Sequence, residues 1–134
     1  LDGRATRRWS IDDLAAPIAS GTFRTAGMIV APCSMATVSA VATSRSGDLL
    51  ERAADVTLKE RRPLVLLARE APLHVGHLRL LVSAAEIGAT ILPPVPAFYA
   101  GLTSIADLVE QIAARAIDGL GIDTGTLRRW QGRG

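Results

Sequence analysis

The stretch GMIVAPCSMATVSAVATS, residues 27–44, predicts a buried strand that feeds directly into a helix. Residues 28–31 are apolar on both faces, as in a central strand of a parallel sheet. Ser34 is a suitable N-cap for a helix that we expect over residues 34–43. This helix is built of small residues and carries several hydroxyls. Such a helix is either packed tightly against a neighbour or begins very close to a ligand.

The same pattern of buried strand and helix continues along the chain. We expect strands over residues 26–32, 63–68 and 89–94, and helices over 34–43, 48–61, 75–87 and 104–120. Asp48 and Ser104 are the expected caps of the second and last helices. Residues 1–24 read as a loop with one helical turn, and residues 121–134 as a C-terminal tail. Alternating strands and helices predict an α/β fold with a parallel sheet covered on both faces.

Composition restricts the class of protein. A chain of 134 residues, 49% hydrophobic and 21% charged, is typical of one folded domain, 1–134. The net charge of +2 comes from scattered basic residues without interleaved aromatics, which does not favour nucleic-acid binding. The single cysteine, Cys33, excludes a disulfide within the chain and predicts a cytoplasmic location. Apolar runs are too short for a membrane span.

The loops after the three strands are the candidate sites, since ligands of open parallel sheets bind there. Ser34 and Thr37 could face an anion at a helix N-terminus, or they could form an ordinary cap. Arg69 could clamp a phosphate with Glu70 moving protons, although a solvated pair is an equal alternative. Tyr99, the only tyrosine, follows a proline-rich turn and could instead be an aromatic plug under the loop.

Helix positions suggest further cations. Arg52 and Lys59 are seven residues apart, so they share a face and lie ~10 Å apart along the axis. They could point into one anionic cleft, or form a surface ion-pair ladder with Asp55 between them. Arg115 falls beside the apolar stripe of the last helix, so it can reach the same cleft as Tyr99. Glu110 and Asp118 are expected on the far, solvated face of this helix.

Two other chemistries are weakly indicated. His74 and His77 bracket a helix start, but no third ligand at metal spacing accompanies them, so no metal site is predicted. Cys33 reads as a small core residue, although its place at a helix start would lower the pKa of a thiol.

Four motifs in order carry a resemblance to a known family: APCSMAT (31–37), ERAADV followed by LKERRPLVL (51–66), REAP (69–72) and PAFY (96–99). Together they resemble the UbiX family of flavin prenyltransferases, over about residues 19–130. The resemblance implies a Rossmann-like, flavodoxin-like three-layer αβα fold. It also implies that the family's N-terminal strands and its first FMN-binding loop precede Leu1, so we expect the gene to encode them upstream. The three-stranded sheet, thin for such a fold, agrees with that expectation.

The resemblance implies a reaction and the residues that perform it. The family transfers a dimethylallyl group from dimethylallyl monophosphate to N5 and C6 of reduced FMN, making prenylated FMN for UbiD-type decarboxylases in ubiquinone biosynthesis or aromatic acid decarboxylation. No metal is required. The implied FMN contacts are Ser34, Met35, Ala36, Thr37 and Arg69. The implied dimethylallyl phosphate contacts are Tyr99, Arg115, Arg52 and Lys59, of which the last two are also catalytic together with Glu70.

Alternative functions remain open from the sequence. One is an FMN-dependent protein of the cysteine-decarboxylase type, although those relatives carry a different motif at the position of Ser34–Thr37. Another is a non-catalytic flavin-binding or assembly subunit. In each case we expect a homo-oligomer, and the resemblance implies a dodecamer.

Overall fold

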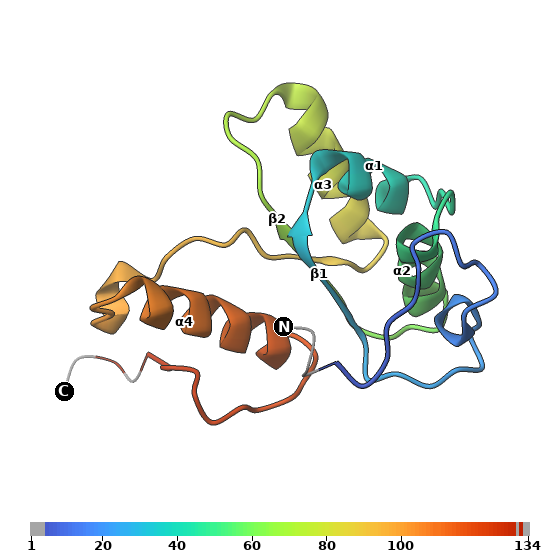
Figure 1. Cartoon of the computed structure of the whole chain (residues 1–134). Helices are drawn as coiled ribbons and strands as arrows, with labels where there is room; N and C mark the ends of the chain where they lie inside the picture. The colour runs from blue at the N-terminus through green and yellow to red at the C-terminus, as the bar shows by residue number, and fades with distance from the viewer. Residues whose placement is uncertain (1–4, 131, 133–134) are drawn as a thin grey trace.

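The computed structural model describes residues 5–130 and 132, which form a three-stranded sheet between two layers of helices. The strands are β1 (Met28–Cys33), β2 (Leu64–Ala68) and β3 (Thr90–Ile91). The helices are α1 (Met35–Ala42), α2 (Leu49–Lys59), α3 (Val75–Glu86) and α4 (Ile105–Asp118), with short 3₁₀ turns η1 (Pro17–Ala19) and η2 (Phe98–Ala100). Figure 1 shows α1, α2 and α3 on one side of the sheet and α4 on the other. This is the predicted αβα arrangement.

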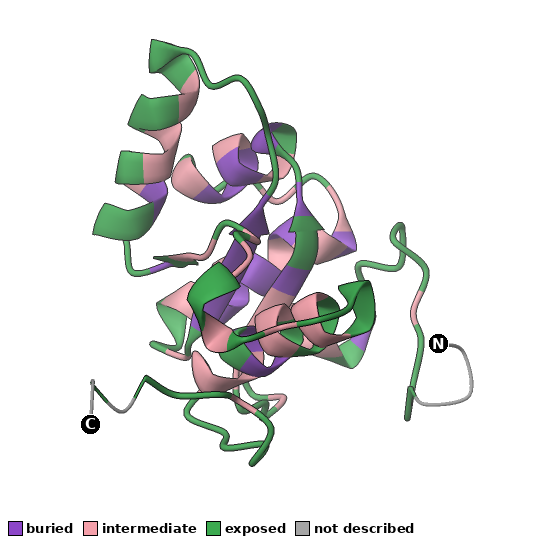
Figure 2. Ribbon diagram, turned by 90° about the vertical axis from the view of Figure 1, so that its left-hand side faces the viewer, coloured by how far each residue is buried: buried purple, intermediate pink, exposed green. Residues whose placement is uncertain are grey.

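The central strand β2 explains why the sequence is apolar on both faces of the sheet. The strand order is β1-β2-β3, and both pairings are parallel. All five residues of β2 are buried, as the purple strand in Figure 2 shows. Leu64 and Leu66 pack into the core shared with α1, α2 and α3, whereas Val65 and Leu67 pack with Ile112 and Ala116 of α4. Alternate residues of one strand therefore hold the two helical layers.

The predicted caps hold the helices at the expected residues. The Ser34 hydroxyl accepts a hydrogen bond from the backbone N–H of Thr37 at 3.2 Å. The Asp48 carboxylate accepts one from the N–H of Glu51 at 2.8 Å. Ser104 accepts from the N–H of Asp107, whose carboxylate accepts in return from the N–H of Ser104. Each cap satisfies a donor that the helix itself leaves unpaired.

The small residues of α1 are explained in part by close packing. Val38 and Ala40 of α1 are almost completely buried, and α1 contacts both α2 and α3. The alternative raised by the sequence, a tightly packed helix, is therefore correct for this face. The start of α1 differs, because Ser34 and Ala36 are exposed.

Several predicted boundaries were wrong. The first strand begins at Met28 and continues through Pro32 to Cys33, where an irregularity in the pairing with β2 accommodates the proline. The third strand is only two residues long, because Leu92 is followed by two prolines that cannot donate to a ladder. The second helix ends at Lys59, not at residue 61, and Arg61 adopts a positive φ of 55° beyond it.

The N-terminal segment, predicted as a loop, packs along α2. The guanidinium of Arg62 donates to the carbonyl oxygens of Gly21 and Phe23, and Nε of Arg52 donates to that of Ala19. The expected turn is present within this segment: the backbone N–H of Ala16 donates to the carbonyl oxygen of Asp13 at 3.1 Å, and the 3₁₀ turn η1 follows directly. These contacts attach residues 19–23 to the layer of α1, α2 and α3.

Candidate functional site

The turn between β1 and α1 lies at the carboxyl edge of the sheet and is open to solvent at its start. The backbone N–H of Arg69 donates to the carbonyl oxygen of Cys33 at 3.1 Å, so the ends of β1 and β2 are joined there. Besides capping α1, the Ser34 hydroxyl lies 3.1 Å from that of Thr37. The turn thus presents hydroxyls and the positive end of a helix dipole next to a cationic residue. This combination suits an anionic ligand.

Two side chains of the same turn face the core instead. Met35 is only 6% exposed and belongs to the main hydrophobic cluster, so its backbone alone is available to a ligand. Cys33 is fully buried, and this burial raises the pKa of its thiol to about 11. The expectation that the helix start would lower this pKa was therefore wrong, because desolvation of the thiolate dominates. Cys33 is a core residue, as its size suggested.

Arg69 and Glu70 follow β2 directly and are both exposed. One carboxylate oxygen of Glu70 accepts a hydrogen bond from the N–H of Ala71 at 3.1 Å. The buried strand β2 ends at Ala68, and the loop that follows it is exposed to solvent. The structure therefore brings Ser34, Thr37, Arg69 and Glu70 to one edge of the sheet, as the positions after the strands predicted.

A separate cleft of about 350 Å³ contains the other predicted pair, Tyr99 and Arg115. It lies between the segment that follows β3 and the face of α4 that carries Gln111, Ile112 and Arg115. Its lining consists of Leu92, Pro93, Val95, Ala97, Tyr99, Gln111, Ile112 and Arg115. The prediction that Tyr99 and Arg115 reach the same cleft is confirmed. Tyr99 is 76% exposed, so it is not an aromatic plug.

The electrostatic partner of Arg115 is a residue that the sequence analysis placed elsewhere. Its Nη1 donates to the Asp118 carboxylate at 2.7 Å, and Arg129 donates to the other oxygen of the same carboxylate. These two cations lower the pKa of Asp118. We expected Asp118 on the far, solvated face of α4, which was wrong because its side chain is only 20% exposed. The spacing of three residues between Arg115 and Asp118 was the available signal.

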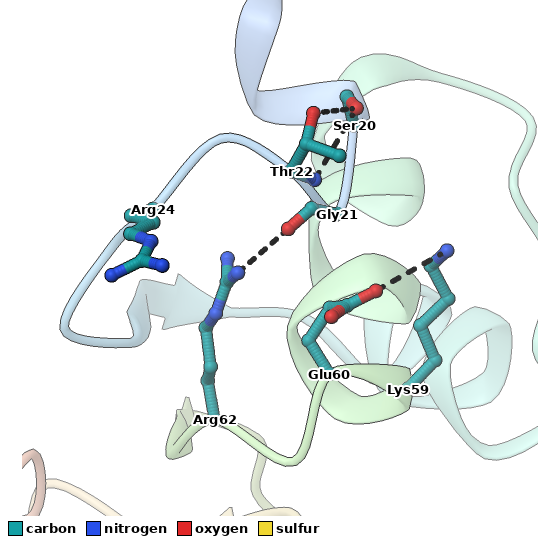
Figure 3. Close-up of a pocket in the computed structure, with 7 residues that line it drawn as sticks. All are labelled: Ser20, Gly21, Thr22, Arg24, Lys59, Glu60 and Arg62. Atoms are coloured by element: carbon teal, nitrogen blue, oxygen red, sulfur yellow. Dashed lines mark hydrogen bonds and ion pairs between the residues drawn. The ribbon is translucent and has the colours of Figure 1, made fainter.

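Arg52 and Lys59 lie on α2, and neither lines the cleft of Tyr99 and Arg115. Lys59 ends α2 at the amino edge of the sheet, where Figure 3 shows it in a pocket of about 520 Å³ with Arg24, Glu60 and Arg62. Arg52 does not line this pocket, so the pocket does not bring the two cations together. Of the two ion pairs expected with Asp55, that of Arg52 is present, at 3.4 Å. Lys59 pairs with Glu60 instead, at 3.6 Å.

The pocket at the amino edge was not found from the sequence. Arg24 and Arg62 are 38 positions apart, and no motif connects them. Only the parallel pairing of β1 with β2 places the segment before one strand beside the segment before the other.

Other candidate features have simpler structural accounts. The rings of His74 and His77 stack with their centroids 3.6 Å apart, and the His74 ring caps α3 by accepting from the N–H of His77. Over residues 5–130 and 132, no three potential metal ligands gather in one place. Within the same part of the chain, no helix has the length and apolar character needed to cross a membrane.

Known proteins share both the sequence and this geometry. The Flavoprotein family profile matches residues 6–117. The flavin prenyltransferase UbiX of Thauera aromatica is 53% identical over 132 residues, which cover 98% of this chain and 68% of that protein. The Escherichia coli K12 protein of the same name is 54% identical over 122 residues, covering 90% of this chain and 65% of that protein.

Solved structures give the same result. The crystal structure of AnUbiX (PadA1) in complex with FMN and dimethylallyl pyrophosphate superposes with a TM-score of 0.88 at 52% identity, covering 92% of this chain and 66% of that one. A dodecameric FMN-dependent UbiX-like decarboxylase from Escherichia coli O157:H7 superposes with a TM-score of 0.85 at 45% identity, covering 91% and 66%. The chain thus spans about two thirds of the length of the relatives it matches. The αβα fold, the strand-end turn and these likenesses agree, and the chain belongs to the flavoprotein family and, within it, to the UbiX flavin prenyltransferases.

Proposed function

We propose that this protein transfers a dimethylallyl group from dimethylallyl monophosphate to N5 and C6 of reduced FMN. The observation that carries the proposal is the solvent-open turn at Ser34–Thr37 with Arg69 and Glu70 beside it, on a fold whose relative was crystallised with FMN and dimethylallyl pyrophosphate. The proposed domain is a single one, spanning residues 1–134. A protein of the cysteine-decarboxylase type is not favoured, because the curated relatives are flavin prenyltransferases.

The residues of the turn fit a flavin phosphate and ring. Ser34 and Ala36 are exposed and small, so a ligand can approach the backbone of α1 closely. We assign Ser34, Met35, Ala36, Thr37 and Arg69 to FMN, with Met35 contributing through its backbone. Reduced FMN supplies the nucleophilic atoms that accept the allyl group.

The cleft of Tyr99 and Arg115 suits the second substrate. Departure of phosphate from an allylic carbon leaves negative charge on the phosphate oxygens, and fixed donors stabilise that charge as it develops. The Arg115 guanidinium is a charged donor, and the Tyr99 hydroxyl is a neutral one. Apolar residues of the same cleft, Leu92 and Ile112 among them, provide a water-poor wall for the allyl group.

Glu70 is the proposed proton carrier. Its carboxylate is exposed and lies beside Arg69 at the end of β2, where the flavin is proposed to bind. A carboxylate in this place can accept the proton released when a new carbon bond forms and pass it to the departing phosphate.

Arg52 and Lys59 are proposed to act on the substrate of a neighbouring copy of the chain. Lys59 ends α2 just before β2, whereas Glu70 follows the other end of β2, so one chain cannot present both of these residues to one ligand. Large apolar side chains are exposed on and just before α3, in η2 and on the first turns of α4, which indicates contacts between copies. These are Leu73, Val75, Leu78, Val82, Phe98, Ile105 and Val109. A related solved structure is dodecameric, which supports the same assembly here.

The direct test is formation of prenylated FMN from reduced FMN and dimethylallyl monophosphate under anaerobic conditions, followed by mass spectrometry. Glu70→Gln removes the proton acceptor with little change of shape, so turnover should fall by roughly 10²-fold or more. A protein that binds FMN yet forms no product would show that the assignment of the reaction is wrong. We propose a cytoplasmic location and a UbiD-type decarboxylase as the recipient of the product.

A further inference from the structure

The C-terminal tail runs back along α4 toward the start of this helix, as Figure 1 shows for the red segment. Its attachment point is Arg128. The backbone N–H of Arg128 donates to Oε1 of Gln111 at 3.1 Å, and Nε2 of Gln111 donates to the carbonyl oxygen of Arg128 at 3.0 Å. One amide side chain thus pairs with both backbone groups of one tail residue. These two hydrogen bonds fix the position of the Arg128 backbone relative to α4.

The Arg128 side chain then reaches the turn that carries Tyr99. Its Nη1 donates to the carbonyl oxygens of Ala100 and Gly101, both at 3.1 Å. Gly101 ends η2 with a φ of 64°, a left-handed conformation that glycine adopts without strain. Arg128 therefore joins η2 to α4, the two elements that face each other across the cleft.

The next two tail residues contact Tyr99 and the ion-pair partner of Arg115. The Trp130 ring lies edge-on to the Tyr99 ring, with centroids 6.1 Å apart and an interplanar angle of 89°. Arg129 shares the Asp118 carboxylate with Arg115. Three consecutive residues thus contact Tyr99, its turn, or the partner of Arg115.

Packing alone holds η2 weakly. Phe98 is 80% exposed and Tyr99 is 76% exposed, so neither side chain is anchored in the core. The hydrogen bonds of η2 other than those from Arg128 are local within the described chain, such as the N–H of Ala100 to the carbonyl oxygen of Ala97. A loop held this loosely would have to be ordered on binding, and that ordering reduces affinity.

We propose that Arg128 is a positioning residue for dimethylallyl phosphate binding: it holds the turn of Tyr99 at a fixed place opposite Arg115. The inference rests on the proposed function of this cleft. Arg128 need not touch the substrate to have this effect, because its Nη1 donates to the turn itself. It acts on the affinity for the phosphate substrate and not on FMN, whose proposed contacts lie at the ends of β1 and β2.

Arg128→Met and Arg128→Lys in the complete enzyme test this role. Methionine keeps much of the apolar stem but no donor, whereas lysine keeps a charged donor. With Arg128→Met we expect KM and the calorimetric Kd for dimethylallyl monophosphate to rise about tenfold, or ~1.4 kcal/mol. We expect kcat within about twofold of wild type and an unchanged FMN titration. Arg128→Lys should recover most of the lost affinity. Arg7→Met, at an exposed arginine of the N-terminal segment that belongs to none of the proposed sites, is the matched control and should change neither constant.

The outcomes separate the inference from the proposed function. Wild-type substrate affinity in Arg128→Met overturns the inference, and so does an equal loss of FMN and phosphate affinity, which would show a general structural role. If the wild-type protein binds dimethylallyl monophosphate but makes no prenylated FMN, the proposed reaction fails, and the Kd values still decide the role of Arg128. If the wild-type protein does not bind this phosphate, both proposals fail.

Discussion

The separation of Lys59 from Glu70 predicts that two inactive variants restore activity to each other. Lys59 lies before β2 and Glu70 lies after it, and five residues of strand put ~17 Å between those ends. A site that needs both side chains must therefore take them from different copies. Lys59→Ala and Glu70→Gln should each lower turnover by roughly 10²-fold, because each removes one group that acts in the transition state.

The activity expected of mixed oligomers follows from random assembly of the two variants. If the two variants assemble at random from equal amounts, a site has an intact Glu70 from one copy in half of the cases and an intact Lys59 from its neighbour in half. About a quarter of the sites should then be complete, giving ~25% of wild-type turnover per site.

The assay is anaerobic formation of prenylated FMN by co-expressed variants with two different tags, purified in sequence so that only mixed oligomers remain. Co-expression of Glu70→Gln with wild type is the control and should give about half of the wild-type turnover. Mixed oligomers as inactive as their parents would refute the sharing of sites between copies. Substantial activity of Lys59→Ala alone would remove Lys59 from the site altogether.

Three further outcomes are expected. Arg115→Ala should lower kcat/KM by ~10²-fold, as for other lost anion donors, while the flavin titration stays unchanged; loss of FMN binding instead would contradict the assignment. Gly27→Ala should destabilise the fold by about 1–3 kcal/mol in urea unfolding, because Gly27 has a φ of 153° and a Cβ there would lie 2.5 Å from the Pro63 carbonyl oxygen; an unchanged midpoint would be evidence against this. Burial raises the pKa of the Cys33 thiol from about 9 to about 11, so its contribution to stability is complete below about pH 9 and lost as the pH rises toward 11. Iodoacetamide should accordingly label native Cys33 far more slowly than the urea-unfolded chain at pH 8, and equal rates would show an accessible thiol.

Features set by local sequence were predictable. Ser34, Asp48 and Ser104 are small or acidic residues immediately before apolar-periodic segments, and each caps the helix expected of it. Burial of β2 on both faces followed from its unbroken apolar run. The short length of β3 could not be predicted in the same way, because the apolar run continues past Ile91, the last residue of the strand, to the two prolines.

The site was predictable only where neighbouring strand ends form it. Arg69 comes beside Cys33 because parallel strands end at one edge, which is a general rule of such sheets. The contact of Arg128 with Ala100 has no such rule, since it depends on the path of an irregular tail. The position of Arg115 around the helix axis predicted the correct cleft. It could not show that the Asp118 side chain turns inward and pairs with Arg115.

The anchoring of Met35 has a consequence for how a flavin would bind. The side chain in the middle of the SMAT turn is fixed in the core, and the hydroxyls on either side of it are already hydrogen-bonded to each other. The turn is thus preorganised, so no ordering of this segment has to accompany binding. Amide hydrogen exchange in residues 34–37 should already be slow without flavin, and the association rate should depend on diffusion and charge rather than on a conformational step. Flavin prenyltransferases use their flavin as a substrate and must release the product in each cycle. A preorganised binding turn suits such an enzyme, since repeated exchange of the ligand leaves the protein in one conformation.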